Sequence, residues 1–259
     1  MTRLTYHIDN NISIAEPNLN TGLNYLNTSL MVILSGFMAF GLILFNADVM
    51  SGEYNPGTLK FLLIQPVTRI KVLLSKYLST VMTSIGLIVG IQLLFALGLG
   101  LINGFGSLDL PIMMGERYKE VFEEGYRVLR VIPSSGTLVD FSQYLLQGLL
   151  LEILFIFAMV AFIMMVSVIS KSTVMAFTVL IGTLLSTNIV YSLSTTYRSL
   201  SPFIFLHHTN VNGILSGRII QETGLLSFTY PLSIIVLTLS TLVFLGISMV
   251  IFKKRDILI

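Results

Sequence analysis

Long hydrophobic runs dominate the chain and are separated by shorter polar segments. Five runs stand out, at residues 30–47, 72–102, 145–169, 174–193 and 231–252. Each has about 18 residues or more, the length at which a helix rising 1.5 Å per residue crosses the roughly 30 Å hydrocarbon core of a bilayer. Backbone groups find no water there, so each run should be a continuous helix. The pattern predicts an all-α, polytopic membrane protein with five spans.

The connections contain two further predicted elements. Residues 107–143 include the stretch GERYKEVFEEGYRVLRVI, where apolar residues recur near every third or fourth position, which predicts an amphipathic helix on a surface. Residues 201–217 are apolar but are interrupted by Pro202 and Gly213. They predict a re-entrant or interfacial segment, because a run broken in this way is too short to span.

Composition agrees with a membrane protein. The chain is 54% hydrophobic and 11% charged, whereas soluble domains have about 25% charged residues. It contains no cysteine, which excludes disulfides and thiolate metal sites. The formal net charge of +2 is too small to indicate nucleic acid as a partner. No metal site and no cofactor are predicted.

The distribution of basic residues predicts the orientation. Positive charges near the ends of spans mark cytoplasmic connections. They gather in short connections at Lys60, Arg69, Lys71, Lys76, Lys171, Lys253, Lys254 and Arg255. In a plasma-membrane protein, residues 48–71, the turn at Lys171 and the C-terminus should then be cytoplasmic. The N-terminal segment 1–29 is polar and lacks the apolar core of a signal peptide, and we expect it to be external.

The connection at residues 48–71 is the most informative part of the chain. It continues from Glu53 as EYNPGTLKFLLIQPVTRIKVLLSK, with an amphipathic turn or two, a proline stop and then basic residues. A short amphipathic helix of this kind on a cytoplasmic surface can be held in a groove of another protein.

This segment resembles the first cytoplasmic loop of the ABC type-2 transporter permeases. In that family an acidic residue precedes Gly-Thr-Leu, an apolar pair, Pro-Val-Ser/Thr-Arg and a lysine at the start of the next span. The matching residues here are Glu53, Gly57-Thr58-Leu59, Pro66-Val67-Thr68-Arg69 and Lys76. The resemblance covers about residues 30–257 and implies one transmembrane domain over that range. It also implies a six-span core, of which five spans are predicted here: either the first span is absent by truncation, or the chain is a five-span variant.

The resemblance implies a membrane-spanning permease subunit of an ATP-driven ABC exporter. Cytoplasmic ABC ATPase subunits would hydrolyse ATP, and a second permease subunit, identical or different, would complete the pathway among the membrane lipids. The chain itself would not be an enzyme, and it contains no G-x-x-x-x-G-K-[ST] phosphate loop. The implied ATPase-coupling residues are Glu53, Gly57, Thr58, Leu59, Lys60, Leu63, Gln65, Pro66, Arg69 and Lys76.

Polar residues within the spans are candidates for a substrate path, because ionisable and polar groups are costly in a bilayer. The candidates are Glu152 and Asn188. Glu152 has two other interpretations, a partner of Arg127 or Arg130 and a group that reaches the interface. Asn188 belongs to a helix rich in hydroxyl residues, for which helix packing is the alternative.

Two other functions fit parts of the sequence. Glu123-Glu124 with Arg127, residues 203–207 and residues 208–212 superficially resemble motifs of CAAX-protease-like intramembrane metalloproteases. The first motif is one residue short, and the two histidine motifs adjoin each other in one connection. The other alternative is a non-transporting membrane partner, such as an immunity or sensor subunit. Binding of an ATPase to residues 58–69 would distinguish it from an exporter.

Overall fold

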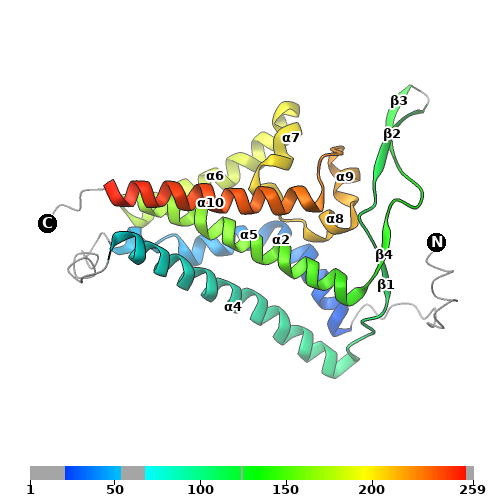
Figure 1. Ribbon diagram of the computed structural model, residues 1–259, viewed down its shortest axis with the longest axis horizontal. Helices are drawn as coiled ribbons and strands as arrows, with labels where there is room; N and C mark the ends of the chain where they lie inside the picture. Colours follow the sequence, from blue (N-terminus) through cyan, green and yellow to red (C-terminus); the bar gives the residue numbers. More distant parts are fainter. Residues whose placement is uncertain (1–20, 54–67, 124, 255–259) are drawn as a thin grey trace. The chain divides into compact units, whose positions relative to one another are not determined.

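A computed structural model describes residues 21–53, 68–123 and 125–254, with the backbone alone at residues 30–36 and 123. This part of the chain is mostly helical (Figure 1). Its helices are α2 (Gly22–Asn46), η1 (Ser51–Glu53), α4 (Arg69–Asn103), α5 (Phe141–Ile169), α6 (Thr173–Leu193), α7 (Thr195–Leu200), η2 (Ser201–Phe203), η3 (Phe205–His207), α8 (Val211–Ser216), α9 (Arg218–Thr223) and α10 (Tyr230–Lys254).

Four of these helices, α4, α5, α6 and α10, are long and apolar enough to cross a membrane. They confirm a polytopic helical membrane protein, and they contain the predicted runs 72–102, 145–169, 174–193 and 231–252. The predicted number of spans differs: the described residues contain four such helices, not five. The remaining run, 30–47, falls almost entirely within α2, whose first turns are polar, with Asn24, Asn27 and Thr28.

The chain divides into two compact units, which are described separately. Unit 1 comprises Met1–Ser35, Val89–Glu152 and His207–Ile234, and unit 2 comprises Gly36–Ile88, Ile153–Leu206 and Ile235–Ile259.

The core of unit 2 is built around α5. Two thirds of the most apolar window of α5 is buried, against 11–17% for α4, α6 and α10. Within unit 2, the Phe162 ring packs against Phe205 and Phe244, with centroids 5.4 and 5.3 Å apart. The Tyr77 hydroxyl donates a hydrogen bond to the Phe157 carbonyl over 3.0 Å. Helix α5 is therefore the enclosed helix of this unit.

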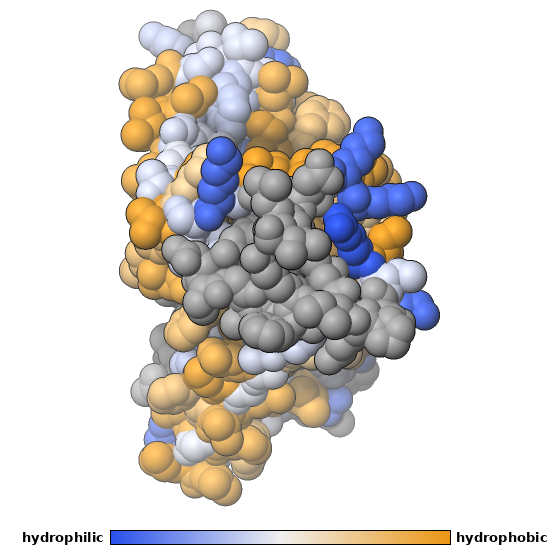
Figure 2. Space-filling view, turned by 90° about the vertical axis from the view of Figure 1, so that its left-hand side faces the viewer, coloured by the Kyte–Doolittle hydropathy of each residue, from blue (hydrophilic) through white to orange (hydrophobic). Residues whose placement is uncertain are grey.

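The other long helices leave large apolar side chains uncovered. Leu94 and Leu101 of α4, Val174 of α6 and Leu242 of α10 are each more than 60% exposed. Figure 2 shows hydrophobic residues over much of the visible surface, with several hydrophilic residues grouped toward its right-hand side. Such surfaces suit contact with lipid, because apolar side chains are more stable against acyl chains than in water.

Unit 1 contains four strands where the sequence predicted a helix, so the prediction of an amphipathic helix in residues 107–143 is wrong. Strand β1 (Pro111–Met114) pairs antiparallel with β4 (Thr137–Asp140), and β2 (Tyr118–Glu123) pairs antiparallel with β3 (Tyr126–Val131). The β2–β3 pair lies between β1 and β4 in the chain and extends away from the helices of unit 1 (Figure 1).

Local sequence explains why this segment forms strands. Strands β2 and β3 are rich in tyrosine, valine and phenylalanine, which favour strands. They are joined by two residues, of which Gly125 has φ +83°, the left-handed conformation that tight hairpins require. An ion pair joins Arg127 to Glu120, which is diagonal to it across the pair. The helical spacing of the apolar residues was coincidental.

The apolar segment 201–217 is broken, as predicted, and Pro202 lies at one of the breaks: α7 ends at Leu200, and the short turns η2 and η3 precede α8. The prediction for Gly213 is wrong. Helix α8 begins after Asn210, whose side-chain oxygen accepts a hydrogen bond from the Gly213 amide over 2.8 Å. Gly213 thus lies inside the helix and does not interrupt it. A further break comes at Gly217, which has φ +87° and separates α8 from α9.

Candidate functional site

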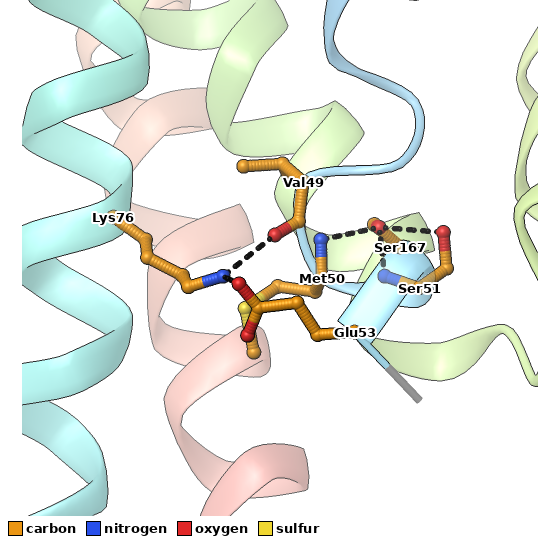
Figure 3. A network of polar contacts seen from close by, with 6 residues as sticks. All are labelled: Val49, Met50, Ser51, Glu53, Lys76 and Ser167. Atoms are coloured by element: carbon orange, nitrogen blue, oxygen red, sulfur yellow. Dashed lines mark hydrogen bonds and ion pairs between the residues drawn. The ribbon is translucent and has the colours of Figure 1, made fainter. Parts of the chain in front are cut away.

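Helices η1 and α4 lie on either side of the connection 54–67 in the chain, and both belong to unit 2 at this point. Their contact is called the junction. Glu53, the last residue of η1, forms an ion pair with Lys76 of α4 (Figure 3). Lys76 Nζ also donates a hydrogen bond to the Val49 carbonyl over 3.1 Å. Only 19% of the Lys76 side chain and 27% of the Glu53 side chain are exposed. This ion pair therefore connects the chain segment before 54–67 to the helix after it.

A buried serine of α5 holds the same segment from the other side. The Ser167 hydroxyl, which is fully buried, accepts hydrogen bonds from the Met50 and Ser51 amides over 3.1 and 2.9 Å. It also donates to the Ala47 carbonyl over 3.0 Å. These backbone groups follow the end of α2, where helical hydrogen bonding ends. The chain entering the connection is thus fixed to both α4 and α5 (Figure 3).

The predicted coupling residues divide between the described and undescribed parts of the chain. The structure brings Glu53 and Lys76 together, and Arg69 is the first residue of α4. The others lie outside the described residues: Gly57, Thr58, Leu59, Lys60, Leu63, Gln65 and Pro66. Sequence reasoning missed Ser167, because one serine in an apolar run gives no sign of its partners.

Of the two predicted substrate-path residues, Glu152 is fully buried. In unit 1, the Gln92 amide of α4 donates a hydrogen bond to Glu152 Oε1 of α5 over 2.8 Å. The other oxygens of the pair, Glu152 Oε2 and Gln92 Oε1, have no partner among the described residues. The alternative in which Glu152 pairs with Arg127 is wrong, since Arg127 pairs with Glu120 on the hairpin.

The second predicted path residue, Asn188, has a different environment. It is exposed on α6, and its amide donates to the Leu184 carbonyl of the same helix over 2.8 Å. Asn188 therefore satisfies a backbone group of its own helix, as the packing alternative also allows.

The histidines that motivated the metalloprotease alternative lie in unit 1. Buried His208 is hydrogen-bonded through Nδ1 to Ser233 Oγ over 2.9 Å. Ser233 in turn donates to the Thr229 carbonyl over 3.0 Å, which makes Nδ1 the donor toward Ser233. Within the described ranges, no group of three His, Asp or Glu side chains is placed to hold a metal ion.

Unit 1 also contains a hollow lined by both polar and apolar side chains. Its volume is about 430 Å³, and Asn27 of α2, Tyr144 of α5 and Asn212 of α8 lie in its wall. The Tyr144 hydroxyl donates to Asn212 Oδ1 over 2.6 Å, and Asn212 Nδ2 donates to Asn27 Oδ1 over 3.1 Å. Three helices that are distant in sequence thus share one hydrogen-bond network. No motif in the sequence predicted it.

Comparison with known proteins corrects the resemblance stated above. Residues 2–258 match a family described as "Protein of unknown function (DUF2705)". No curated protein and no solved structure matches the chain. Membership of the ABC type-2 permease family was a wrong prediction, because the match over nearly the whole chain is to another family. The pattern that suggested it, a short basic and weakly amphipathic connection, is common to cytoplasmic loops of membrane proteins in general. The chain belongs to the DUF2705 family.

Proposed function

We propose that this protein is the membrane-embedded subunit of an ATP-driven exporter of the plasma membrane. Cytoplasmic ATPase subunits dock on the connection 54–67 and supply the ATP hydrolysis, and a second membrane subunit completes the pathway. The observation that carries this proposal is the junction on which the connection begins and ends, formed by Glu53, Lys76 and Ser167.

The junction supports transmission of force from the connection to the helices. A push on a loosely attached loop would be absorbed by the loop itself. Here the segment before the connection is bonded to α4 through Lys76 and to α5 through Ser167. Movement of the connection therefore acts on two spanning helices together, as coupled elements in conformational switches do.

The length of α4 supports the same proposal. Its 35 residues correspond to a helix about 52 Å long at 1.5 Å per residue. A bilayer core is roughly 30 Å thick, so α4 is long enough to extend beyond it. A continuous helix that begins beside the docking connection suits the role of a rigid lever.

The Gln92–Glu152 pair supports a path through the spans. Buried polar groups without partners are costly, and this pair retains two such oxygens among the described residues. It joins α4, the proposed lever, to α5. In this proposal the pair changes partners when α4 moves, and substrate or water reaches it then.

Co-purification tests the docking step directly. The full chain in lipid nanodiscs is mixed with the ATPase encoded beside it, and bound ATPase and ATP turnover are measured. The double variant Leu59→Asp with Leu63→Asp should abolish binding, because charges replace the apolar side of the connection. The matched control is Leu226→Asp, at an exposed leucine of unit 1, which should bind normally.

Two outcomes contradict the proposal. Equal binding by the double variant and the control would show that the connection does not dock an ATPase. Binding without any effect of the membrane subunit on ATP turnover would show that the docked ATPase is not coupled to the spanning helices.

A further inference from the structure

The hollow in unit 1 has the size of a ligand-binding site. Small-molecule sites typically enclose about 300–1,000 Å³, and this one encloses about 430 Å³. Its walls come from α2, the start of α5, β1, α8, the start of α9 and the segments between α4 and β1 and between β1 and β2, all within unit 1. The proposed ATPase docking uses none of these residues.

One part of the wall is apolar. It is formed by Leu23, Leu110, Ile112, Met113 and Phe141. Side chains of this kind gain free energy when a ligand's apolar groups displace water from them. The site therefore favours a ligand with some apolar surface.

Another part of the wall presents carboxamides. The bond from Asn212 Nδ2 to Asn27 Oδ1 fixes the orientation of both amides. No described residue accepts a hydrogen bond from the Asn27 amide nitrogen, so that donor is available to a ligand. Asn24 and Ser216 add further polar groups to the wall. Carboxamides both donate and accept, which suits a ligand that does the same.

Two opposite charges complete the lining. Glu116 and exposed Arg218 both line the hollow, yet neither belongs to a salt bridge among the described residues. Among the described residues, the Glu116 carboxylate accepts only a long hydrogen bond, 3.5 Å, from the Tyr118 hydroxyl. Opposite charges that share a cavity without pairing are available to a ligand carrying both signs.

The backbone makes this wall rigid. The Gly115 and Glu116 amides donate to the Leu215 and Ser216 carbonyls over 2.8 and 3.0 Å. A Cβ at Gly217 would lie 2.2 Å from the Glu116 carbonyl oxygen, so only glycine permits so close an approach. The residues that carry Glu116 and Arg218 are thus locked together. A preformed site loses less entropy on binding.

We infer that this hollow binds a short peptide with free termini. The peptide ammonium pairs with Glu116, its carboxylate pairs with Arg218, its amide groups contact Asn27, and its side chains lie on the apolar wall. A zwitterionic lipid headgroup carries both charges as well. Phosphocholine, however, has no hydrogen-bond donor, and phosphoethanolamine has only its ammonium, so neither supplies an amide that both donates to and accepts from the carboxamides of the wall. The peptide is therefore the better match.

Titration calorimetry on the full chain in nanodiscs tests this inference. The probe is the tripeptide of alanine, leucine and alanine, compared with its N-acetylated and its C-amidated forms. Each blocked form should bind about tenfold more weakly, because it lacks one charge-assisted hydrogen bond. Phosphocholine is titrated in parallel.

Substitutions assign each end of the peptide. Arg218→Gln should weaken binding of the free peptide about tenfold but leave the affinity for the amidated form unchanged. Glu116→Gln should also weaken binding of the free peptide about tenfold, and it should leave the affinity for the acetylated form unchanged. Lys119→Gln is the control, at an exposed cation that does not line the hollow. Absence of tripeptide binding, equal binding of the blocked forms, or binding of phosphocholine in place of the peptide would each overturn the inference. No ATPase is present, so the result is independent of the proposed function.

Discussion

At the residue scale, Lys76 has the most defined role. Replacement by methionine in Lys76→Met removes both the ion pair to Glu53 and the hydrogen bond to the Val49 carbonyl. It also leaves Glu53, whose second oxygen is already buried without a described partner, as a half-buried lone charge. We expect the free energy of unfolding to fall by about 1–3 kcal/mol, measured by denaturant titration in detergent.

A nearby lysine provides the control for this change. Lys71 lies on the first turns of α4 and is exposed. Lys71→Met should change the free energy of unfolding by less than about 0.5 kcal/mol. Equal effects at both positions would mean that the ion pair contributes nothing to the junction.

His207 makes stability depend on pH. Burial lowers the pKa of His207 below its ordinary value of 6.5, because desolvation disfavours the charged ring. Below pH 6.5 the unfolded chain therefore binds a proton that the folded chain does not. Stability due to this residue is complete above pH 6.5 and is lost as the pH falls from there toward the folded pKa.

The comparison of wild type with His207→Gln isolates this effect. Thermal midpoints of both proteins are measured from pH 7.5 to 5.5, and we expect the wild type to lose stability relative to the variant below pH 6.5. Other histidines are common to both proteins and cancel. Parallel curves would show that His207 is equally easy to protonate in both states.

At the element scale, Gly217 allows the turn between α8 and α9 to pack closely against the backbone of Glu116, between β1 and β2. Alanine at this position places a Cβ 2.2 Å from the Glu116 carbonyl oxygen and must adopt φ +87°. We expect Gly217→Ala to destabilise the protein by about 2–5 kcal/mol, as strain and overpacking add.

Gly224, at the other end of α9, separates these two causes. Its φ is +78°, but a Cβ there meets nothing within 4 Å. Gly224→Ala should therefore cost only the conformational strain, about 1–2 kcal/mol. Thermal unfolding gives the midpoints of both variants and of the wild type. Equal decreases in midpoint for Gly217→Ala and Gly224→Ala would show that the close approach at Gly217 is unimportant.

At the scale of the whole molecule, the orientation in the membrane is open to a direct test. The chain has no cysteine, so one introduced thiol reports one position. Ser142→Cys and Thr173→Cys replace exposed residues near the starts of α5 and α6. The distribution of basic residues predicts that 142 is external and 173 cytoplasmic. A membrane-impermeant maleimide should label 142 in intact cells, and 173 only after permeabilisation. The reverse labelling would invert the proposed topology and remove the cytoplasmic docking connection.

The outcomes at particular residues show what local sequence can predict. The runs that became α4, α5, α6 and α10 were predictable, because a long apolar run is recognised from its own composition. The predicted helix in residues 107–143 failed, because its apolar spacing fits two structures. Tyrosine and valine content and the Gly125 turn favoured strands there. Glu53 and Lys76 were singled out separately, but nothing in the sequence paired them.

The sequence alone was enough to predict a protein built from membrane-spanning helices. Whether a segment lies in lipid or in water depends on its own hydrophobicity. Only the tertiary structure decided which polar groups meet. Ser167 binds backbone amides more than 100 positions away, Glu152 finds Gln92 on another helix, and Asn27 joins Asn212 beside the hollow. Such contacts depend on which helix faces pack together, and that is settled by the whole chain rather than by any segment.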